Sequence, residues 1–135
     1  MSAIQLKNGI PSAFGLCPGV STIEDIEKEF GAIENIESIN GADLYSFSNG
    51  SIQAAKDREH STIATLWVSC EVGPLHAMPE SLAQMQQIFQ DLRVAQKPEN
   101  GILLAECKGV KVACDLSDQW EGSQKIIWLE LTRPD

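Results

Sequence analysis

The sequence lacks the short motifs by which common enzyme classes are recognised. It contains no GxSxG nucleophile elbow, no phosphate-binding P-loop, no GxGxxG dinucleotide-binding turn and no zinc-binding HExxH. Its two histidines, His60 and His76, have no acid or nucleophile at a triad-like spacing. We therefore expect a protein that is not an enzyme and that needs no cofactor.

Paired cysteine motifs are also absent. The four cysteines are Cys17, Cys70, Cys107 and Cys114, and no two of them are spaced as CxxC. Because each cysteine lies on an expected strand or beside a proline, we interpret the four as reduced thiols of the core. The alternatives are a disulfide or a metal site. The acidic residues of 115–121 lack the alternating spacing and central glycine of a calcium loop, so no metal is expected there.

Long apolar runs and an excess of basic residues are missing too. No stretch approaches the length of a membrane span, and Met1 to Leu16 has no basic start followed by a long apolar run, as a secretory signal would. The formal net charge of −9 argues against a nucleic-acid partner, because phosphate contacts need a basic surface. We expect a cytoplasmic protein with no membrane or nucleic-acid partner.

What is present is enough for one globular domain. A chain of 135 residues, 43% of them hydrophobic, can bury a core. Its acidic charge gathers in one segment: between Ser21 and Asp43 there are seven acidic residues and a single base, Lys28. Such a segment is either a solvated surface that keeps the protein soluble or a docking surface for a basic partner.

A helix is predicted between Ser21 and Gly31. Ser21 suits the N-cap, and Glu24 three residues later can complete a capping box. Gly31 suits the left-handed residue just past the helix end. The apolar face of this helix consists of Ile23, Ile26 and Phe30.

The same apolar spacing returns 59 residues later, in Leu82, Met85 and Phe89, after Met78-Pro79. Each helix leads through an irregular link to an Asn-Gly pair, at Asn40-Gly41 and Asn100-Gly101. We therefore expect a single domain, residues 1–135, made of two repeats at about 15–73 and 75–133.

A predicted hairpin follows each link. The first turns at Asn49-Gly50 and the second at Lys108-Gly109, and in both the implied register gives one wholly apolar face. The expected pairs are Phe47 with Ile52 and Tyr45 with Ala54 in the first hairpin, and Cys107 with Val110, Ala105 with Val112, Leu103 with Cys114 and Glu106 with Lys111 in the second.

A third strand completes each predicted unit, at 62–72 and 125–132. Strict alternation turns Leu66 and Val68 toward the helices in the first, and Ile127 and Leu129 in the second. The expected fold class is α+β: tandem helix-plus-three-strand repeats that form an antiparallel sheet with helices on one face.

The same alternation turns Trp67 and Trp128 away from the helices, among mostly polar side chains. Large aromatics in such surroundings are typical of a protein-binding patch, unless the segment from Ile4 to Phe14 or a second copy of the protein covers them. The candidate protein-binding residues are Trp67, Trp128, Thr65, Gln53, Lys111, Ile126 and Glu130.

The pattern Gly-Leu-x-Pro-Gly-x-Ser-Thr-x-Glu-Asp-Ile-x-x-x-Phe-Gly, from Gly15 to Gly31, is followed by Leu44-Tyr-Ser-Phe and by Ile63-Ala-Thr-Leu-Trp-Val. This series resembles the repeat of β-lactamase-inhibitor-protein-like domains, and the small outer-membrane assembly lipoprotein is similar to a single repeat. The second repeat has Gln90 where Gly31 stands, and it matches by spacing. The resemblance implies a tandem helix-and-sheet fold whose open sheet face contacts other proteins.

Three functional hypotheses follow. The first is a non-enzymatic interaction module that binds a protein, or itself as a homodimer, through the face with the two tryptophans. The second is an acidic immunity or inhibitor protein that docks on a basic enzyme through Glu24, Glu27, Glu34 and Glu37. The third is a small enzyme or ligand carrier with Cys107, Cys17 or a histidine as its reactive group.

Overall fold

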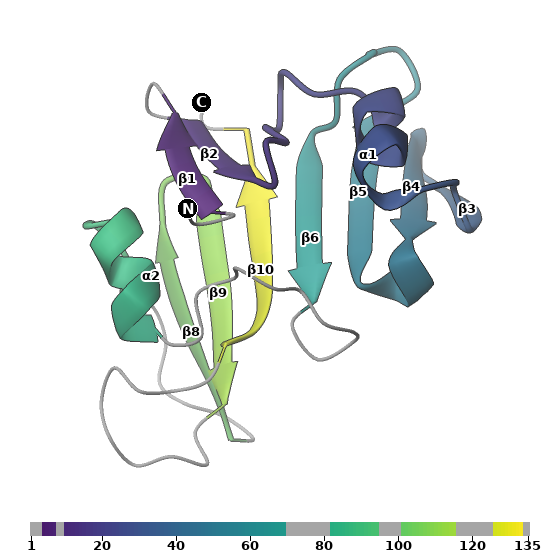
Figure 1. Ribbon diagram of the computed structural model, residues 1–135. Coiled ribbons are helices and arrows are strands. Elements are labelled where there is room, and N and C mark those ends of the chain that lie inside the picture. Colours follow the sequence, from purple (N-terminus) through teal and green to yellow (C-terminus); the bar gives the residue numbers. More distant parts are fainter. Residues whose placement is uncertain (1–3, 8–9, 70–81, 95–100, 116–125, 134–135) are drawn as a thin grey trace.

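The computed structural model describes residues 4–7, 10–69, 82–94, 101–115 and 126–133 (Figure 1). Strands dominate this part of the chain. Its α-helices are α1 (Ile23–Phe30) and α2 (Leu82–Ile88), and a 3-10 turn, η1 (Ser48–Gly50), lies between two strands. The strands are β1 (Ile4–Lys7), β2 (Ile10–Ala13), β3 (Asn35–Ile39), β4 (Ala42–Phe47), β5 (Ile52–Asp57), β6 (Thr65–Ser69), β7 (Arg93–Val94), β8 (Ile102–Cys107), β9 (Val110–Asp115) and β10 (Ile126–Thr132).

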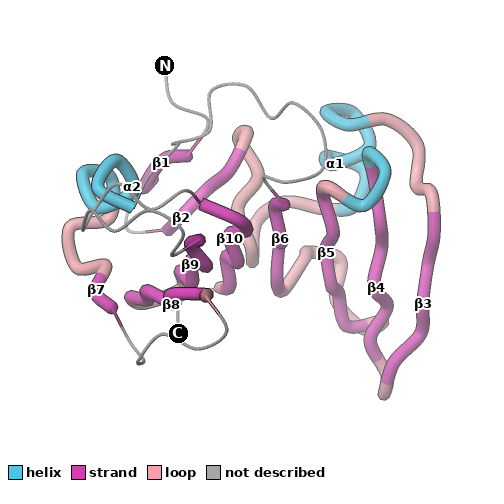
Figure 2. The backbone as a smooth tube through the Cα atoms, turned by 90° about the horizontal axis from the view of Figure 1, so that it is seen from below, coloured by secondary structure: helices cyan, strands magenta, loops and turns pink. Residues whose placement is uncertain are grey.

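Eight of these strands form one antiparallel sheet, in the order β3-β4-β5-β6-β10-β9-β8-β7. Figure 2 shows them side by side. Strands β3 to β6 follow one another along the chain, and so do β7 to β10. The last strand of each half pairs with the last strand of the other, because β6 lies beside β10. The two halves therefore share one continuous sheet.

The expected fold class is wrong. The protein does not consist of tandem units with one helix and three strands. Each half contributes four strands to one large sheet, and β1 and β2 form a separate two-stranded sheet. The unexpected strands β3 and β7 are the two edges of the sheet, and they lie in segments that were expected to be irregular links. Asn40 and Gly41 have φ of 46° and 85°, as in a two-residue hairpin turn, and they connect β3 to β4.

The core lies on one face of the sheet. Leu66 and Val68 of β6 and Leu129 and Leu131 of β10 are fully buried there, where the two halves meet. The β1–β2 hairpin lies over β9 and β10, between the two helices, and β2 contacts β10 (Figures 1 and 2). The helices and this hairpin contribute Ile26, Met85, Ile4 and Ala13 to the same buried cluster.

Both predicted hairpin registers are confirmed. Every expected pair of the β4–β5 and β8–β9 hairpins is present, including Glu106 opposite Lys111. The predicted helix faces are confirmed as well: Ile23 and Ile26 are buried, and so are Leu82, Met85 and Phe89, while Phe30 is partly buried. The expectations for Cys70, His76, Met78, Pro79 and Asn100, and for residues 116–125, concern positions outside the described ranges.

Strand β10 contains an irregularity that strict alternation did not predict. Ile126 pairs with Cys114 and Trp128 with the adjacent Ala113, so Ile127 is an extra residue, a β-bulge. Ile126 is consequently 2% exposed in the core, whereas Ile127 is only partly buried. The assignment of Ile126 to the face with the tryptophans was therefore wrong, and so was the assignment of Ile127 to the core.

Helix α1 begins one residue later than predicted. The N-cap is Thr22, whose Oγ1 accepts the backbone N–H of Asp25 at 3.2 Å, and the Asp25 carboxylate accepts the N–H of Thr22 at 2.9 Å. This reciprocal pair replaces the expected one between Ser21 and Glu24. Ser21 is buried instead, and its Oγ accepts the backbone N–H of Cys17 at 2.9 Å.

Leu129→Ala is expected to lower the free energy of unfolding by roughly 3 kcal/mol, because it leaves a cavity where the two halves join. Urea denaturation followed by circular dichroism measures the change. The matched control is Leu6→Ala, since Leu6 is 51% exposed and its loss should cost less than about 0.5 kcal/mol. Equal effects of the two substitutions would contradict the buried β6–β10 junction.

Thr22→Ala should lower the free energy of unfolding by about 1 kcal/mol, because the first turn of α1 loses its side-chain acceptor. Hydrogen bonds with Thr22 hold the pKa of Asp25 below its usual value. The largest effect comes from the backbone N–H of Thr22, and its side chain adds a smaller one. A lowered pKa means that the Asp25 contribution to stability is present above the unfolded-state pKa and is lost as the pH falls through the folded-state pKa.

An NMR titration of the Asp25 carboxyl group measures this pKa. It should rise in Thr22→Ala, because the side-chain hydrogen bond of Thr22 is lost while the backbone N–H of residue 22 stays. The control is Glu24→Gln, because Glu24 is exposed and lies outside the observed cap. A larger loss of stability in Glu24→Gln than in Thr22→Ala would restore the cap predicted from the sequence.

Candidate functional site: the tryptophan pocket

The face of the sheet opposite the core carries Trp67 and Trp128. Trp67 lies between the buried Leu66 and Val68, and Trp128 precedes the buried Leu129, so both indoles point away from the core. Both are partly buried. We call this side of the sheet the open face. Of the residues predicted for it, Trp67, Trp128, Thr65, Gln53, Lys111 and Glu130 lie there and Ile126 does not.

A single row of side chains crosses all eight strands on the open face, each residue lying opposite the next. Its centre is Trp67 on β6 opposite Glu130 on β10. Trp128 lies one row away, opposite Ser69, so the two tryptophans are diagonal neighbours across the β6–β10 junction. From edge to edge the row is Asn35, Ser46, Gln53, Trp67, Glu130, Lys111, Glu106 and Arg93.

The half of this row beyond Trp67 alternates in charge, through Glu130, Lys111, Glu106 and Arg93. Opposite charges facing each other on neighbouring antiparallel strands attract, and the alternation favours the pairing of β10, β9, β8 and β7 even though the charged atoms of opposite members lie more than 4 Å apart. We call these four residues the charge ladder. Its acidic end, Glu130, is the member nearest the tryptophans.

A pocket of about 470 Å³ opens on the open face at the junction of the two halves. Both indoles, Gln53 and Glu130 line it, and we call it the tryptophan pocket. Its size lies within the roughly 300–1,000 Å³ of common ligand pockets. Thr65 and Lys111 lie on the open face but outside this lining. The sequence prediction missed the remaining polar and apolar walls, which include Leu44, Ser69, Gly50 and Ser51.

The turn at the rim of the pocket is held in a costly backbone conformation. Ser48 and Asn49 have φ of 51° and 58°, which is uncommon for residues other than glycine. The Ser51 hydroxyl donates to the carbonyl of Ser48 at 2.7 Å, and the N–H of Asn49 donates to Oε1 of Glu34 at 2.7 Å. These bonds hold Gly50 and Ser51 in place beside the pocket.

The four acidic residues of the second hypothesis do not form one surface. Glu24 and Glu27 lie on α1, whereas Glu34 binds the turn before β5. Glu37 lies on β3 opposite Leu44, on the open face, and its carboxylate accepts a hydrogen bond from Asn35 at 3.4 Å. The acidic charge of this segment is therefore divided between the two sides of the sheet.

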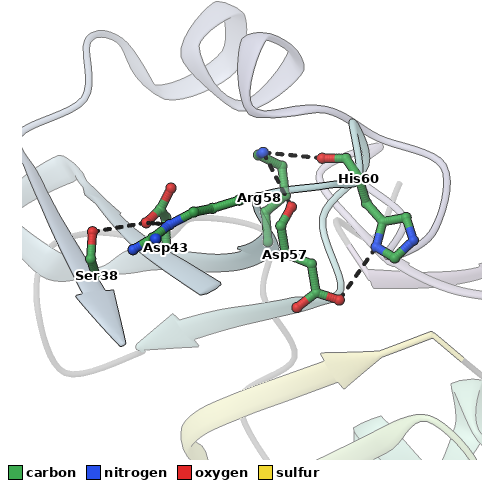
Figure 3. Close-up of polar contacts among 6 residues, drawn as sticks. Ser38, Asp43, Asp57, Arg58 and His60 are labelled. Atoms are coloured by element: carbon green, nitrogen blue, oxygen red, sulfur yellow. Dashed lines mark hydrogen bonds and ion pairs between the residues drawn. The ribbon is translucent and has the colours of Figure 1, made fainter. Parts of the chain in front are cut away.

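The charged turn after β5 contains the one histidine of the described chain, paired with an acid. The ring Nδ1 of His60 lies 3.3 Å from a carboxylate oxygen of Asp57, and both side chains are exposed (Figure 3). Beside them, Asp43 accepts from the Ser38 hydroxyl at 2.9 Å and from Arg58 at 3.2 Å. Both hydrogen bonds lower the pKa of Asp43, and the one from Ser38 has the larger effect. The contacts of Asp43 therefore link β3, β4 and the turn after β5.

Three cysteines lie in the described ranges, and none of the three forms a disulfide. Cys17 and Cys114 are buried, and burial, followed by the nearby Asp91 carboxylate, raises the pKa of the partly exposed Cys107. A raised pKa disfavours the nucleophilic thiolate. No group of histidine, cysteine and acidic side chains in the same ranges could hold a metal ion. None of the helices found there is long and apolar enough to cross a membrane.

No known protein family and no curated protein matches the chain. Among solved structures, a cysteine-rich secretory protein from Staphylococcus aureus is similar, with a TM-score of 0.48 and 11% sequence identity. The similarity covers 84% of this chain and 44% of that protein, so the chain spans less than half of that protein's length. The resemblance to β-lactamase-inhibitor-protein-like repeats stays a prediction.

Cys107 is expected to react with iodoacetamide more slowly than glutathione at neutral pH, because its raised pKa keeps the thiol protonated. The rate should increase as the pH rises. Asp91→Asn should accelerate the reaction about twofold to threefold, since removing a nearby negative charge lowers a thiol pKa. Mass spectrometry of the Cys107 peptide after timed quenching measures the rates. A Cys107 that outpaces glutathione would revive the enzyme hypothesis.

Proposed function

We propose that this protein is a non-enzymatic interaction module that binds another protein through the open face of its sheet. The observation that supports the proposal is the tryptophan pocket, with two indoles at the centre of a mostly polar face. Tryptophan is the residue most enriched at the energetic centres of protein interfaces, which polar rims surround. Gln53 and Glu130 supply polar groups that can orient a bound side chain.

Strands β1 and β2, the described part of the N-terminal segment before Phe14, lie on the core side of the sheet and not over the tryptophans. Ile4 of β1 and Ala13 of β2 are buried in the core cluster, on the opposite side of the sheet. The β1–β2 hairpin therefore leaves the open face available to a partner. A homodimer through this face would bring together two chains of net charge −9, so a partner of different charge is favoured.

The other two hypotheses have less support. An inhibitor that docks through Glu24, Glu27, Glu34 and Glu37 needs these carboxylates on one surface, and they are divided between two sides of the sheet. An enzyme that uses Cys107 needs a lowered thiol pKa, and burial raises this one.

A photo-reactive amino acid placed at Thr65 tests the proposal, because Thr65 lies on the open face without lining the pocket. In a lysate of the native host, irradiation should give an adduct of defined mass, and Trp67→Ala with Trp128→Ala should abolish it. The matched control is the same probe at Lys28, an exposed residue of α1. An adduct at Lys28 with none at Thr65 would refute the proposal and transfer binding to the helix.

A further inference from the structure

Among the described residues, the lining of the tryptophan pocket combines two indole rings with one charged side chain, the carboxylate of Glu130. No basic side chain of the described chain lines it. The faces of an indole carry negative electrostatic potential and attract cations, and tryptophan does so more strongly than tyrosine or phenylalanine. The rings and the carboxylate therefore favour the same kind of ligand, one that carries positive charge.

Glu130 lies at the end of the charge ladder and has an opposite charge on one side only. Lys111 lies opposite it on β9, and Trp67 lies opposite it on β6. Within the described chain the ion pairs closer than 4 Å are Arg58 with Asp43 and His60 with Asp57, so neither Lys111 nor another base closes on Glu130. Lys111 has a second acidic neighbour, Glu106, on its other side. Within the described chain, Lys111 forms no ion pair closer than 4 Å with either of these two carboxylates.

We propose that the tryptophan pocket receives a basic side chain of the partner protein, an arginine by preference, which stacks on the indoles and pairs with Glu130. The inference rests on the proposed function and names the chemistry of the partner at that site. Arginine is favoured over lysine because its planar guanidinium both stacks on aromatic rings and binds a carboxylate through two N–H groups. The net charge of −9 of the whole chain favours encounter with a basic partner and disfavours a second copy of the chain.

The experiment uses two blocked tripeptides, Gly-Arg-Gly and Gly-citrulline-Gly, which differ in charge and hardly in shape. They are titrated into the full chain while the indole N–H resonances of Trp67 and Trp128 are followed by NMR. The arginine peptide should shift both resonances saturably and bind at least about fivefold more tightly than the citrulline peptide, as expected for cation–π and ion-pair contacts. Its affinity should fall as the salt concentration rises.

Glu130→Gln separates the carboxylate from the fold, because it removes the charge and keeps the shape. It should weaken the arginine peptide about fivefold to tenfold and leave the citrulline peptide unchanged. The matched control is Lys111→Gln on the neighbouring strand, which should bind arginine as well as the wild type or up to about threefold better. Unchanged backbone spectra establish that both variants are folded.

Equal binding of the two peptides, or an arginine affinity that Glu130→Gln does not change, would refute the inference. The proposed function would survive that result if the cross-link from Thr65 still formed. Loss of the Thr65 cross-link would instead refute the interaction through the open face. A dimer in light scattering whose Trp67 and Trp128 resonances shift on dilution would show that a second copy occupies the pocket, and it would overturn the choice of a basic side chain.

Discussion

The pairing of β6 with β10 is the interaction on which the rest of the molecule depends. It places Leu66 opposite Leu131 and Val68 opposite Leu129, and thereby joins the buried faces of both halves into one core. Without it, each half would end in an unpaired strand edge that could bind other chains. The same pairing determines which side chains lie on the open face, because successive side chains along a strand point to opposite sides of the sheet. Burying the four aliphatic residues turns Trp67 and Trp128 outward and makes them neighbours.

Sequence reasoning succeeded where two local signals agreed. In the β4–β5 and β8–β9 hairpins the turn residues and the apolar alternation point to the same register, and that register is observed. It failed at the edges of the sheet, because all five residues of β3 and both of β7 are exposed and so have no apolar alternation to detect. One signal is present in the sequence, since Asn40-Gly41 is a typical hairpin turn, but without apolar alternation before it the pair also fits the end of an irregular link.

The bulge and the helix cap were ambiguous in the sequence for a related reason. Ile126 and Ile127 are adjacent and equally apolar, so either can begin the buried series, and only pairing with Cys114 and Ala113 decides between them. Ser21 and Thr22 are both good caps. Tertiary structure makes the choice here too, because the buried hydroxyl of Ser21 is needed by a backbone N–H of the preceding turn. The apolar alternation is enough to assign Gln53, Thr65 and Glu130 to the open face. The pocket also requires β6 to lie beside β10, and the alternation within single strands does not reveal the order of the strands.

The position of Glu130 determines what kind of surface the pocket presents. In an alternating ladder the interior members have opposite charges on both sides, and a terminal member has one on a single side only. Here the acidic end of the ladder adjoins the indoles, and a basic end there would have opposed their attraction for cations. The ring quadrupole and the carboxylate charge are independent physical terms, yet they favour the same sign of ligand. Two aromatic rings alone would favour any ligand with a large apolar surface. The carboxylate of Glu130 beside them adds a preference for a ligand with positive charge.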